Sequence, residues 1–309
     1  MAYFDLQING YAGVDFNDDV LDHASLAMVC QRLESQGVEG ILATVVTDSI
    51  DRMEERIARL ASLVEEHDEF QRMIKGIHVE GPFINPHSGY RGAHPQDAII
   101  PADTSLMERL LAAGRGLVRL VTLAPEGDSG LRVTRMLADR KIIVSAGHTD
   151  ASLDQLCAAI DNGLTMFTHV GNGCPASMPR HDNIIQRVLS LHGKLWLCFI
   201  ADGAHIPFFV LKNYFDLVGL EKTIVVTDGI AAADLGPGRY KFGRWDMNIG
   251  DDLVARSPDK SHFLGSTVTM PRTFQNLTES LGMPAADALT LIESNPQKAL
   301  GHAFQAGAG

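Results

Sequence analysis

Histidines and carboxylates close several apolar runs of this sequence, at positions where a fold can gather them. In GIHVEGP (76–82), His78 and Glu80 occupy alternate positions of a strand-like run, so both side chains face the same way. Two other runs, SAGH and FTH, end on His148 and His169. One carboxylate with two imidazoles suits a catalytic zinc ion that keeps an open position for water. We therefore predict that Glu80, His148 and His169 bind a metal.

Two more side chains belong to this set by their positions. Asp228 closes the run VVTD and would stand across the same mouth, within reach of the water that the metal activates. There it can serve as a general base, whereas its alternative role is to cap the turn DGIAAAD that begins with it. His78 lies one pleat deeper than Glu80, so we expect it to support Glu80 rather than to contact the metal.

The elements that must position these residues are short apolar runs, which alternate with amphipathic segments. Such runs predict parallel strands that helices cover on one or both faces. Eight in regular succession favour an α/β fold, a closed (β/α)8 barrel of the TIM type, over an open doubly wound sheet. No G-x-G-x-x-G follows the first run, which weakens a dinucleotide-binding alternative. The predicted strands cover residues 3–8, 40–47, 74–80, 117–124, 141–148, 165–170, 195–201 and 223–228, and predicted helices cover 49–67, 103–114, 151–163 and 207–219.

The carboxyl ends of barrel strands form one mouth, where barrel enzymes carry their active sites. The strand-end residues named above would therefore lie together. After residue 230 the pattern changes to a β-ribbon over 239–255 and two helices at about 268–281 and 284–293. No linker or repeat interrupts the chain, so we predict a single domain over 1–309, with the ribbon and the C-terminal helices in about 239–300.

Composition excludes several classes of protein. The 26 Lys and Arg against 38 Asp and Glu leave a formal charge of −12, which repels nucleic acid phosphates. The N-terminus has no basic segment followed by a long apolar one, and no apolar run approaches the ~20 residues that span a bilayer. These features predict a cytoplasmic protein without nucleic acid or membrane partners. The cysteines are widely spaced, as expected of free thiols in a reducing compartment: Cys30, Cys157, Cys174 and Cys198.

An ordered set of motifs runs along essentially the whole chain. It comprises DLQINGYAGVDFND (5–18), GIHVEGPFINP with RGAH (76–94), VTLAPE (121–126), VSAGHTDA (144–151), THVGN (168–172), IADGAHI (200–206), VVTDG (225–229), LGSTVTM (264–270) and SNPQKALG (294–301). This set resembles the N-acetylglucosamine-6-phosphate deacetylase family of the amidohydrolase superfamily. The resemblance implies hydrolysis of the acetamido group of a phosphorylated amino sugar. It also implies one divalent ion, Zn²⁺ in the first place, with Fe²⁺, Mn²⁺ or Co²⁺ as alternatives.

The resemblance also assigns roles to individual residues. Asp228 would take a proton as general base and return it to the departing amine as general acid. His94, with the metal, would stabilise the oxyanion. Gln7 and Asn9 stand where many amidohydrolases have an H-x-H pair, which favours a single metal ion. The residues implied in binding the sugar or its phosphate are His205, Asn172, Gly173, Arg180 and Arg91, besides Gln7 and Asn9.

Two departures from the family pattern leave alternatives open. The segment THVGNGCPASMPRHDN (168–183) replaces the usual context of the phosphate-binding arginine, so another N-acyl amino sugar, phosphorylated or not, remains an alternative. We expect the small β-sandwich of the family to be missing here, and because the resemblance implies dimers we expect a homo-oligomer. The rival functions are another metal-dependent amidohydrolase, acting on a different N-acyl compound or a cyclic amide, and a non-catalytic barrel that binds a metal or a sugar phosphate. Asp228 beside a full His₂Glu set argues against a pure binder.

Overall fold

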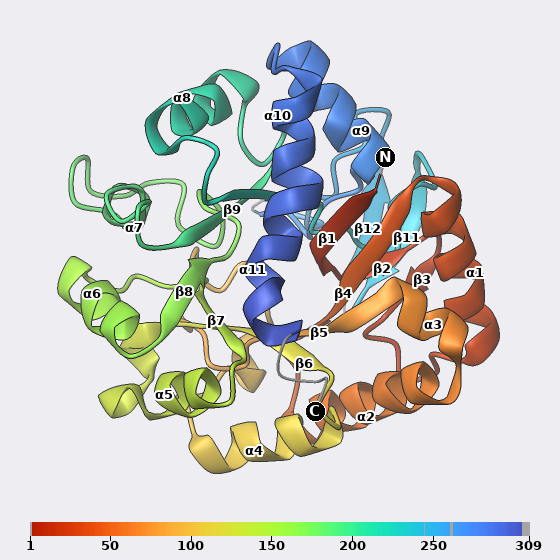
Figure 1. The fold of residues 1–309 in the computed structure, drawn as a ribbon, viewed down its shortest axis with the longest axis horizontal. Helices are drawn as coiled ribbons and strands as arrows, with labels where there is room; N and C mark the ends of the chain where they lie inside the picture. The colour runs from red at the N-terminus through yellow and green to blue at the C-terminus, as the bar shows by residue number, and fades with distance from the viewer. Residues whose placement is uncertain (1, 244, 260–261, 305–309) are drawn as a thin grey trace.

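Eight parallel strands in chain order form the centre of the molecule (Figure 1). The structure, a computed structural model, describes residues 2–243, 245–259 and 262–304. The first and last strands meet through a parallel bridge between Ile8 and Gly229 and a hydrogen bond of 3.0 Å from the Asp228 amide to the Gln7 carbonyl. The predicted (β/α)8 barrel is confirmed. Its strands are β1 (Tyr3–Ile8), β4 (Val38–Val46), β5 (Ile74–Glu80), β6 (Val118–Leu123), β7 (Ile143–Ala146), β8 (Leu164–Phe167), β9 (Trp196–Ile200) and β10 (Thr223–Val226).

Helices form a ring around these strands (Figure 1). Their sequences explain their positions: in α2 (Ile50–Glu66), Met53, Ile57, Leu60 and Val64 recur at helical spacing and are all buried. Side-chain caps mark where many of them begin, as Ser49 does for α2 by accepting from the Arg52 amide. The others are α1 (His23–Ser35), α3 (Asp68–Met73), α4 (Thr104–Ala113), α5 (Arg132–Asp139), α6 (Leu153–Asp161), α7 (Ile184–Leu189) and α8 (Phe208–Val218).

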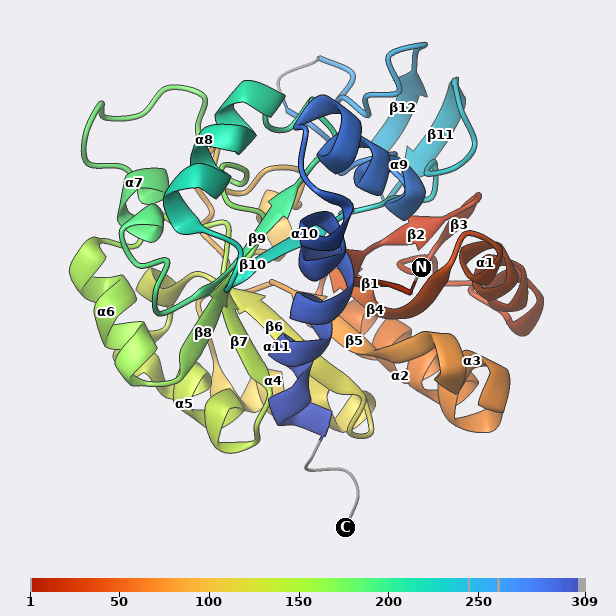
Figure 2. The same cartoon turned by 45° about the horizontal axis from the view of Figure 1, so that its top comes forward.

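The segments outside the barrel pattern follow the predictions in part. The ribbon is present as β11 (Gly238–Phe242) and β12 (Trp245–Ile249), but the small hairpin of β2 (Gly10–Tyr11) and β3 (Val14–Asp15) was not predicted. Figure 2 shows the ribbon and the end of the last helix on opposite sides of the barrel.

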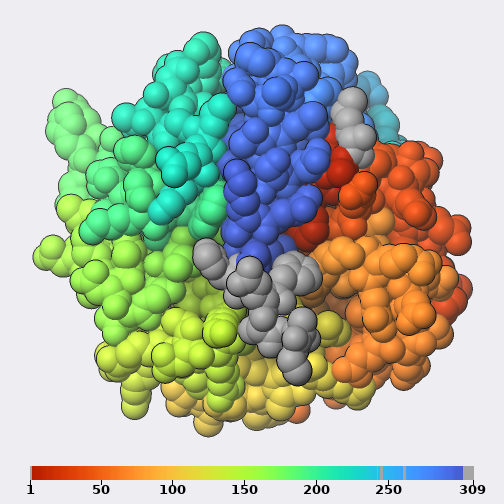
Figure 3. Space-filling model, viewed as in Figure 1, coloured from red at the N-terminus to blue at the C-terminus, as the bar shows by residue number. Residues whose placement is uncertain are grey.

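The C-terminal helices extend further than predicted. The two predicted helices are α9 (Met270–Gln275) with the π-helical turn η4 (Asn276–Ser280), and α10 (Ala285–Leu289) with η5 (Thr290–Ser294). A third, α11 (Asn295–Phe304), was missed because Pro296 in its first turn resembles a helix end. These helices lie as a band across one end of the barrel (Figure 3). No helix of the described residues is long and apolar enough to cross a membrane.

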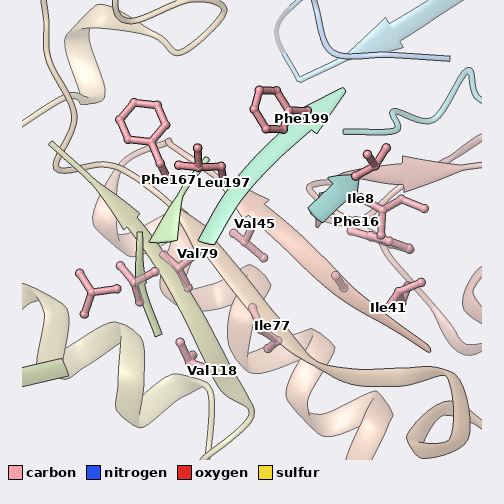
Figure 4. Packing of buried hydrophobic residues seen from close by; sticks show 14 of the residues in the cluster. Ile8, Phe16, Ile41, Val45, Ile77, Val79, Val118, Phe167, Leu197 and Phe199 are labelled. Atoms are coloured by element: carbon pink, nitrogen blue, oxygen red, sulfur yellow. The ribbon is translucent and has the colours of Figure 1, made fainter. Parts of the chain in front are cut away.

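Two groups of buried apolar side chains lie on the two faces of the barrel wall. One group takes alternate residues such as Ile224 and Val226, as expected for side chains inside a barrel, and Leu300 of α11 closes its end. The other, which includes Ile77 and Val79, lies between the strands and the helices (Figure 4). These two residues alternate along β5 with Gly76, His78 and Glu80. All four cysteines are free thiols, as expected.

Candidate active site

Glu80, His148 and His169 come together at the carboxyl ends of β5, β7 and β8. The Nε2 atoms of His148 and His169 lie 3.3 Å and 3.0 Å from one oxygen of Glu80. One donor atom from each residue falls within 4.8 Å of the others, and all three side chains are buried. Burial opposes ionisation of Glu80, but the neighbouring His148 and His169 outweigh it and hold the pKa of its carboxyl well below the usual value. A buried carboxylate with two imidazoles is a donor set for a divalent metal, as the sequence predicted.

The ring of His148 is fixed from several sides. Its Nδ1 lies 2.7 Å from the carbonyl oxygen of Tyr90, which can only accept, so Nδ1 carries the proton of the neutral ring. The lone pair on Nε2 therefore faces Glu80. Gly92 and Gly173 leave room for the ring: a Cβ at Gly92 would lie 3.3 Å from its Cε1, and one at Gly173 would lie 2.9 Å from its Nδ1. Fixing of a ligand through its second nitrogen is typical of metal sites.

Three of the strand-end residues have left-handed backbone conformations. The φ angle is 51° at His148, 31° at His169 and 51° at Asp228. Residues other than glycine rarely adopt positive φ, and such strain concentrates at functional sites. The left-handed residue ends the extended strand and turns its side chain into the mouth of the barrel.

Asp228 is held by the side-chain amides of Gln7 in β1 and of Asn9 directly after it. Gln7 Nε2 and Asn9 Nδ2 donate to its Oδ1 at 3.1 Å and 2.8 Å, and Gln7 Nε2 also lies 3.1 Å from Glu80 Oε1. Burial, with the nearby charge of Glu80, raises the pKa of Asp228 to about 6. Gln7 thus joins the carboxylate of the metal cluster to the predicted base. Asp228 has a defined position in the site, besides any role in the turn that follows it.

His94 stacks edge-on against His148, with ring centroids 4.4 Å apart. Its Nδ1 lies 2.7 Å from the hydroxyl of Thr47, which in turn donates to the Glu80 carbonyl at 3.1 Å. Because the hydroxyl has one proton, it must accept from His94 Nδ1, and the neutral ring then carries its lone pair on Nε2. Burial, with the His148 ring beside it, lowers the pKa of His94 to about 3. Donation to an oxyanion therefore requires the other tautomer, with the Thr47 hydroxyl turned toward the ring.

His205 occupies the loop after β9, where Asp202 fixes it. Its Nδ1 lies 2.6 Å from Asp202 Oδ2, which also accepts from Ser266 Oγ at 3.0 Å. Burial opposes ionisation of Asp202, but the charge of His205 outweighs this and lowers the pKa of Asp202 to about 2. The His205 ring lies 4.6 Å from that of Phe263. This pair orients an imidazole that can contact a polar ligand.

The predicted phosphate contacts are spread more widely. The backbone N–H of Asn172 donates to the His169 carbonyl at 2.9 Å. The side-chain nitrogen of Asn172 is buried without a hydrogen-bond partner in the described structure. Arg91 donates to Gln96 at 3.0 Å. Arg180 is exposed on the loop that leads into α7, which extends away from the barrel (Figure 2). The structure therefore brings Asn172 to the ligand cluster and leaves Arg180 outside it.

Sequence reasoning missed three residues that hold others in place. Thr47 follows β4 and was predicted only as the last residue of a strand, although the rule that singled out Glu80 applies to it equally. Asp202 directly follows the predicted strand 195–201, but the sequence does not show that it is the partner of His205. Tyr90 acts through its main-chain carbonyl, and no side-chain pattern could have found it.

Deacetylases of amino sugar phosphates are similar to this chain over nearly its whole length. N-acetylglucosamine-6-phosphate deacetylase of Bacillus subtilis is 30% identical over 299 residues, which cover 96% of this chain and 74% of that protein. The chain belongs to the N-acetylglucosamine-6-phosphate deacetylase family. N-acetylgalactosamine-6-phosphate deacetylase of Escherichia coli is 27% identical over 300 residues, covering 97% of this chain and 77% of that protein. No family model matches the sequence.

A solved structure of this deacetylase family agrees in fold. A mutant N-acetyl-D-glucosamine-6-phosphate deacetylase from Mycobacterium smegmatis, in complex with N-acetyl-D-glucosamine-6-phosphate, superposes with a TM-score of 0.87 at 29% identity. The superposition covers 97% of this chain and 77% of that chain. The amidohydrolase barrel predicted from the motifs is therefore shown.

Proposed function

We propose that this protein is a metal-dependent deacetylase that hydrolyses N-acetylglucosamine-6-phosphate to the amino sugar phosphate and acetate. One observation carries the proposal. A buried carboxylate and two imidazoles converge on one point, and Gln7 ties that carboxylate to Asp228, whose pKa of about 6 suits proton transfer near neutral pH. Membership of the family supplies the substrate class.

The donor set fits a divalent ion. The Tyr90 carbonyl directs the lone pair of His148 Nε2 toward the ionised Glu80. His148 Nε2 and Glu80 Oε1 are then two acceptors 3.3 Å apart, an arrangement that a cation bound to both would stabilise. Glu80, His148 and His169 would hold Zn²⁺ in the first place, with Fe²⁺, Mn²⁺ or Co²⁺ as alternatives. A bound ion would polarise the amide carbonyl and lower the pKa of the attacking water.

The chain's own groups move the proton. The amides of Gln7 and Asn9 occupy Oδ1 of Asp228, which leaves Oδ2 to take a proton from the attacking water. A C–O bond forms as the water attacks the amide carbon. The C–N bond breaks as Asp228 returns this proton to the departing amine. His94 is proposed to stabilise the oxyanion in its Nε2–H tautomer, which Thr47 allows by rotating its hydroxyl.

The substrate contacts belong to the same proposal. His205, oriented by Asp202, and the unpartnered amide of Asn172 would receive the sugar and its phosphate, with the backbone of Gly173 beside them. Arg180 on its projecting loop is proposed as a phosphate contact. In a dimer, it could contact the phosphate that is bound to the second copy of the chain. We further propose a cytoplasmic location and a single domain for the residues given.

A second candidate substrate is N-acetylgalactosamine-6-phosphate, because a relative at 27% identity is named as a deacetylase of that compound.

The test is acetate release by the metal-loaded protein from both 6-phosphates and from unphosphorylated N-acetylglucosamine. Asp228→Asn serves as the inactive control. Release from N-acetylglucosamine-6-phosphate above its epimer supports the proposal. The absence of release from all three compounds, with metal bound, would sink it and leave another amidohydrolase substrate as the alternative.

A further inference from the structure

A chain of hydrogen bonds between side chains runs inside the barrel, one layer below the metal-binding cluster. His78 Nε2 lies 2.8 Å from Thr122 Oγ1, and Thr122 Oγ1 lies 2.7 Å from Thr168 Oγ1. Thr168 Oγ1 lies 2.6 Å from Ser145 Oγ. All four side chains are buried, with at most 2% of any residue exposed. The chain therefore crosses four neighbouring strand paths, β5, β6, β7 and the end of β8, without reaching solvent.

Each member of this chain lies within three residues of a metal-binding position or pairs with one across a strand ladder. His78 is two residues before Glu80, and Thr168 directly precedes His169. Thr122 pairs with Glu80 across the β5–β6 ladder and with Ser145 across the β6–β7 ladder. Ser145 is three residues before His148. The chain thus links the strands that carry all three ligands.

The layer beneath shows that the barrel does not need polar groups here for packing. Two residues earlier on these strands, Leu120, Ile143 and Met166 fill the interior with apolar side chains. Buried hydroxyls add little net stability over apolar groups of the same shape, but they are directional. Because each hydroxyl has one proton, the direction of the His78–Thr122 bond sets the direction of the next two bonds. Such a chain fixes the distances between strands more strictly than apolar packing does.

We propose that the His78–Thr122–Thr168–Ser145 chain holds the ends of β5 to β8 at the separation that the metal ligands require. Its members are positioning residues, since they act through Glu80, His148 and His169 and touch no reacting atom. The inference rests on the proposed metal site. It also gives His78 a role. The His78 ring hydrogen-bonds Thr122 on the neighbouring strand, so it supports Glu80 by fixing the separation of β5 and β6 rather than by a direct hydrogen bond.

Thr168 is the junction of the chain and the best place to test it. Thr168→Val keeps the size of the side chain and removes the hydroxyl that joins Thr122 to Ser145. Thr168→Ser keeps the hydroxyl. Thr273→Val is the matched control, because Thr273 of α9 is a buried threonine whose hydroxyl has no hydrogen-bond partner among the described residues. The measurement is the Zn²⁺ dissociation constant of each full-length variant by competition with a chelator, with thermal unfolding of the metal-free protein beside it.

We expect Thr168→Val to weaken Zn²⁺ binding about 10- to 100-fold, the range for loss of groups that orient metal ligands. Thr168→Ser and Thr273→Val should stay within about twofold of the unmodified protein. Equal affinity in Thr168→Val would overturn the proposal, as would an equal loss in Thr168→Ser. Should Thr168→Val fail to fold, Ser145→Ala removes one bond at the chain's end, and unchanged binding there would overturn it too. Failure of the unmodified protein to bind any divalent ion would instead refute the metal-dependent function.

Discussion

Gly173 offers the sharpest test of how the site is built. A Cβ at this position would lie 2.9 Å from His148 Nδ1 and 3.2 Å from its Cγ and Cε1. Ordinary contacts begin near 3.4 Å, so Gly173→Ala must push the ring by about half an ångström or distort the loop. The ring cannot move without weakening its hydrogen bond to the Tyr90 carbonyl. We expect Gly173→Ala to weaken metal binding about 10- to 100-fold, or about 1.4–2.7 kcal/mol.

The control for this variant separates the overlap from the backbone cost. Gly173 has a φ of 60° and Gly116 one of 85°, so alanine is strained at both, by about 1–2 kcal/mol. A Cβ at Gly116 would meet nothing within 4 Å. Gly116→Ala should therefore lose stability in urea unfolding and keep its metal and its acetate release.

The same comparison tests the proposed phosphate contact. Alanine keeps the backbone N–H of residue 173, so a role in phosphate binding alone predicts normal metal affinity in Gly173→Ala. The assay is chelator competition at equilibrium, followed by acetate release at saturating metal. Metal affinity in Gly173→Ala equal to that in Gly116→Ala would refute the packing argument and favour the backbone role.

Four further outcomes are expected. Burial raises the pKa of Asp228 to about 6, so kcat/KM should fall about tenfold for each pH unit below that value as the base becomes protonated. A pH profile that stays flat under acid conditions would contradict this role. Asp228→Asn should keep the metal but lose most turnover. His148→Ala and His169→Ala should each lower the metal content sharply, and an unchanged stoichiometry would remove them from the ligand set. Asp228 has a φ of 51°, so Asp228→Gly should be more stable in urea than Asp228→Ala by about 1 kcal/mol, and the reverse order would contradict the left-handed backbone. Burial raises the pKa of Asp5 to about 7, so the folded state holds this proton more tightly than the unfolded state. The free energy of unfolding should therefore fall as the pH rises from about 4 to about 7, by at most about 1.4 kcal/mol per pH unit. Asp5→Asn should flatten that slope in urea titrations. An unaltered slope would show that Asp5 does not cause it.

The strands and the ligand cluster could be predicted because they depend on short-range patterns. Apolar runs define the barrel strands, and the residue after each run must lie at the mouth of a parallel barrel. That is enough to bring Glu80, His148 and His169 together. The small β2–β3 hairpin could not be predicted, because each of its strands has only two residues and shows no alternating pattern.

The supports of the site depend on long-range contacts that spacing does not reveal. The threonines and the serine of the buried chain look like ordinary members of apolar strands, since β-branched threonine is common there. Only the ladder pairing shows that Thr122 stands beside both Glu80 and Ser145. Arg180 is exposed on the loop before α7, so its predicted contact with phosphate depends on a ligand or a second copy of the chain.

The way the barrel is closed has a consequence during synthesis of the chain. β1 pairs with β4 on one side, but its other neighbour is the last barrel strand, and Leu300 of α11 completes the interior cluster that contains Phe4 and Leu6. On the ribosome, at roughly 5–20 residues per second, one edge of β1 waits on the order of 10–40 s for its partner. In that interval the unpaired edge and the open apolar interior offer a surface to which a chaperone, or another nascent copy, can bind.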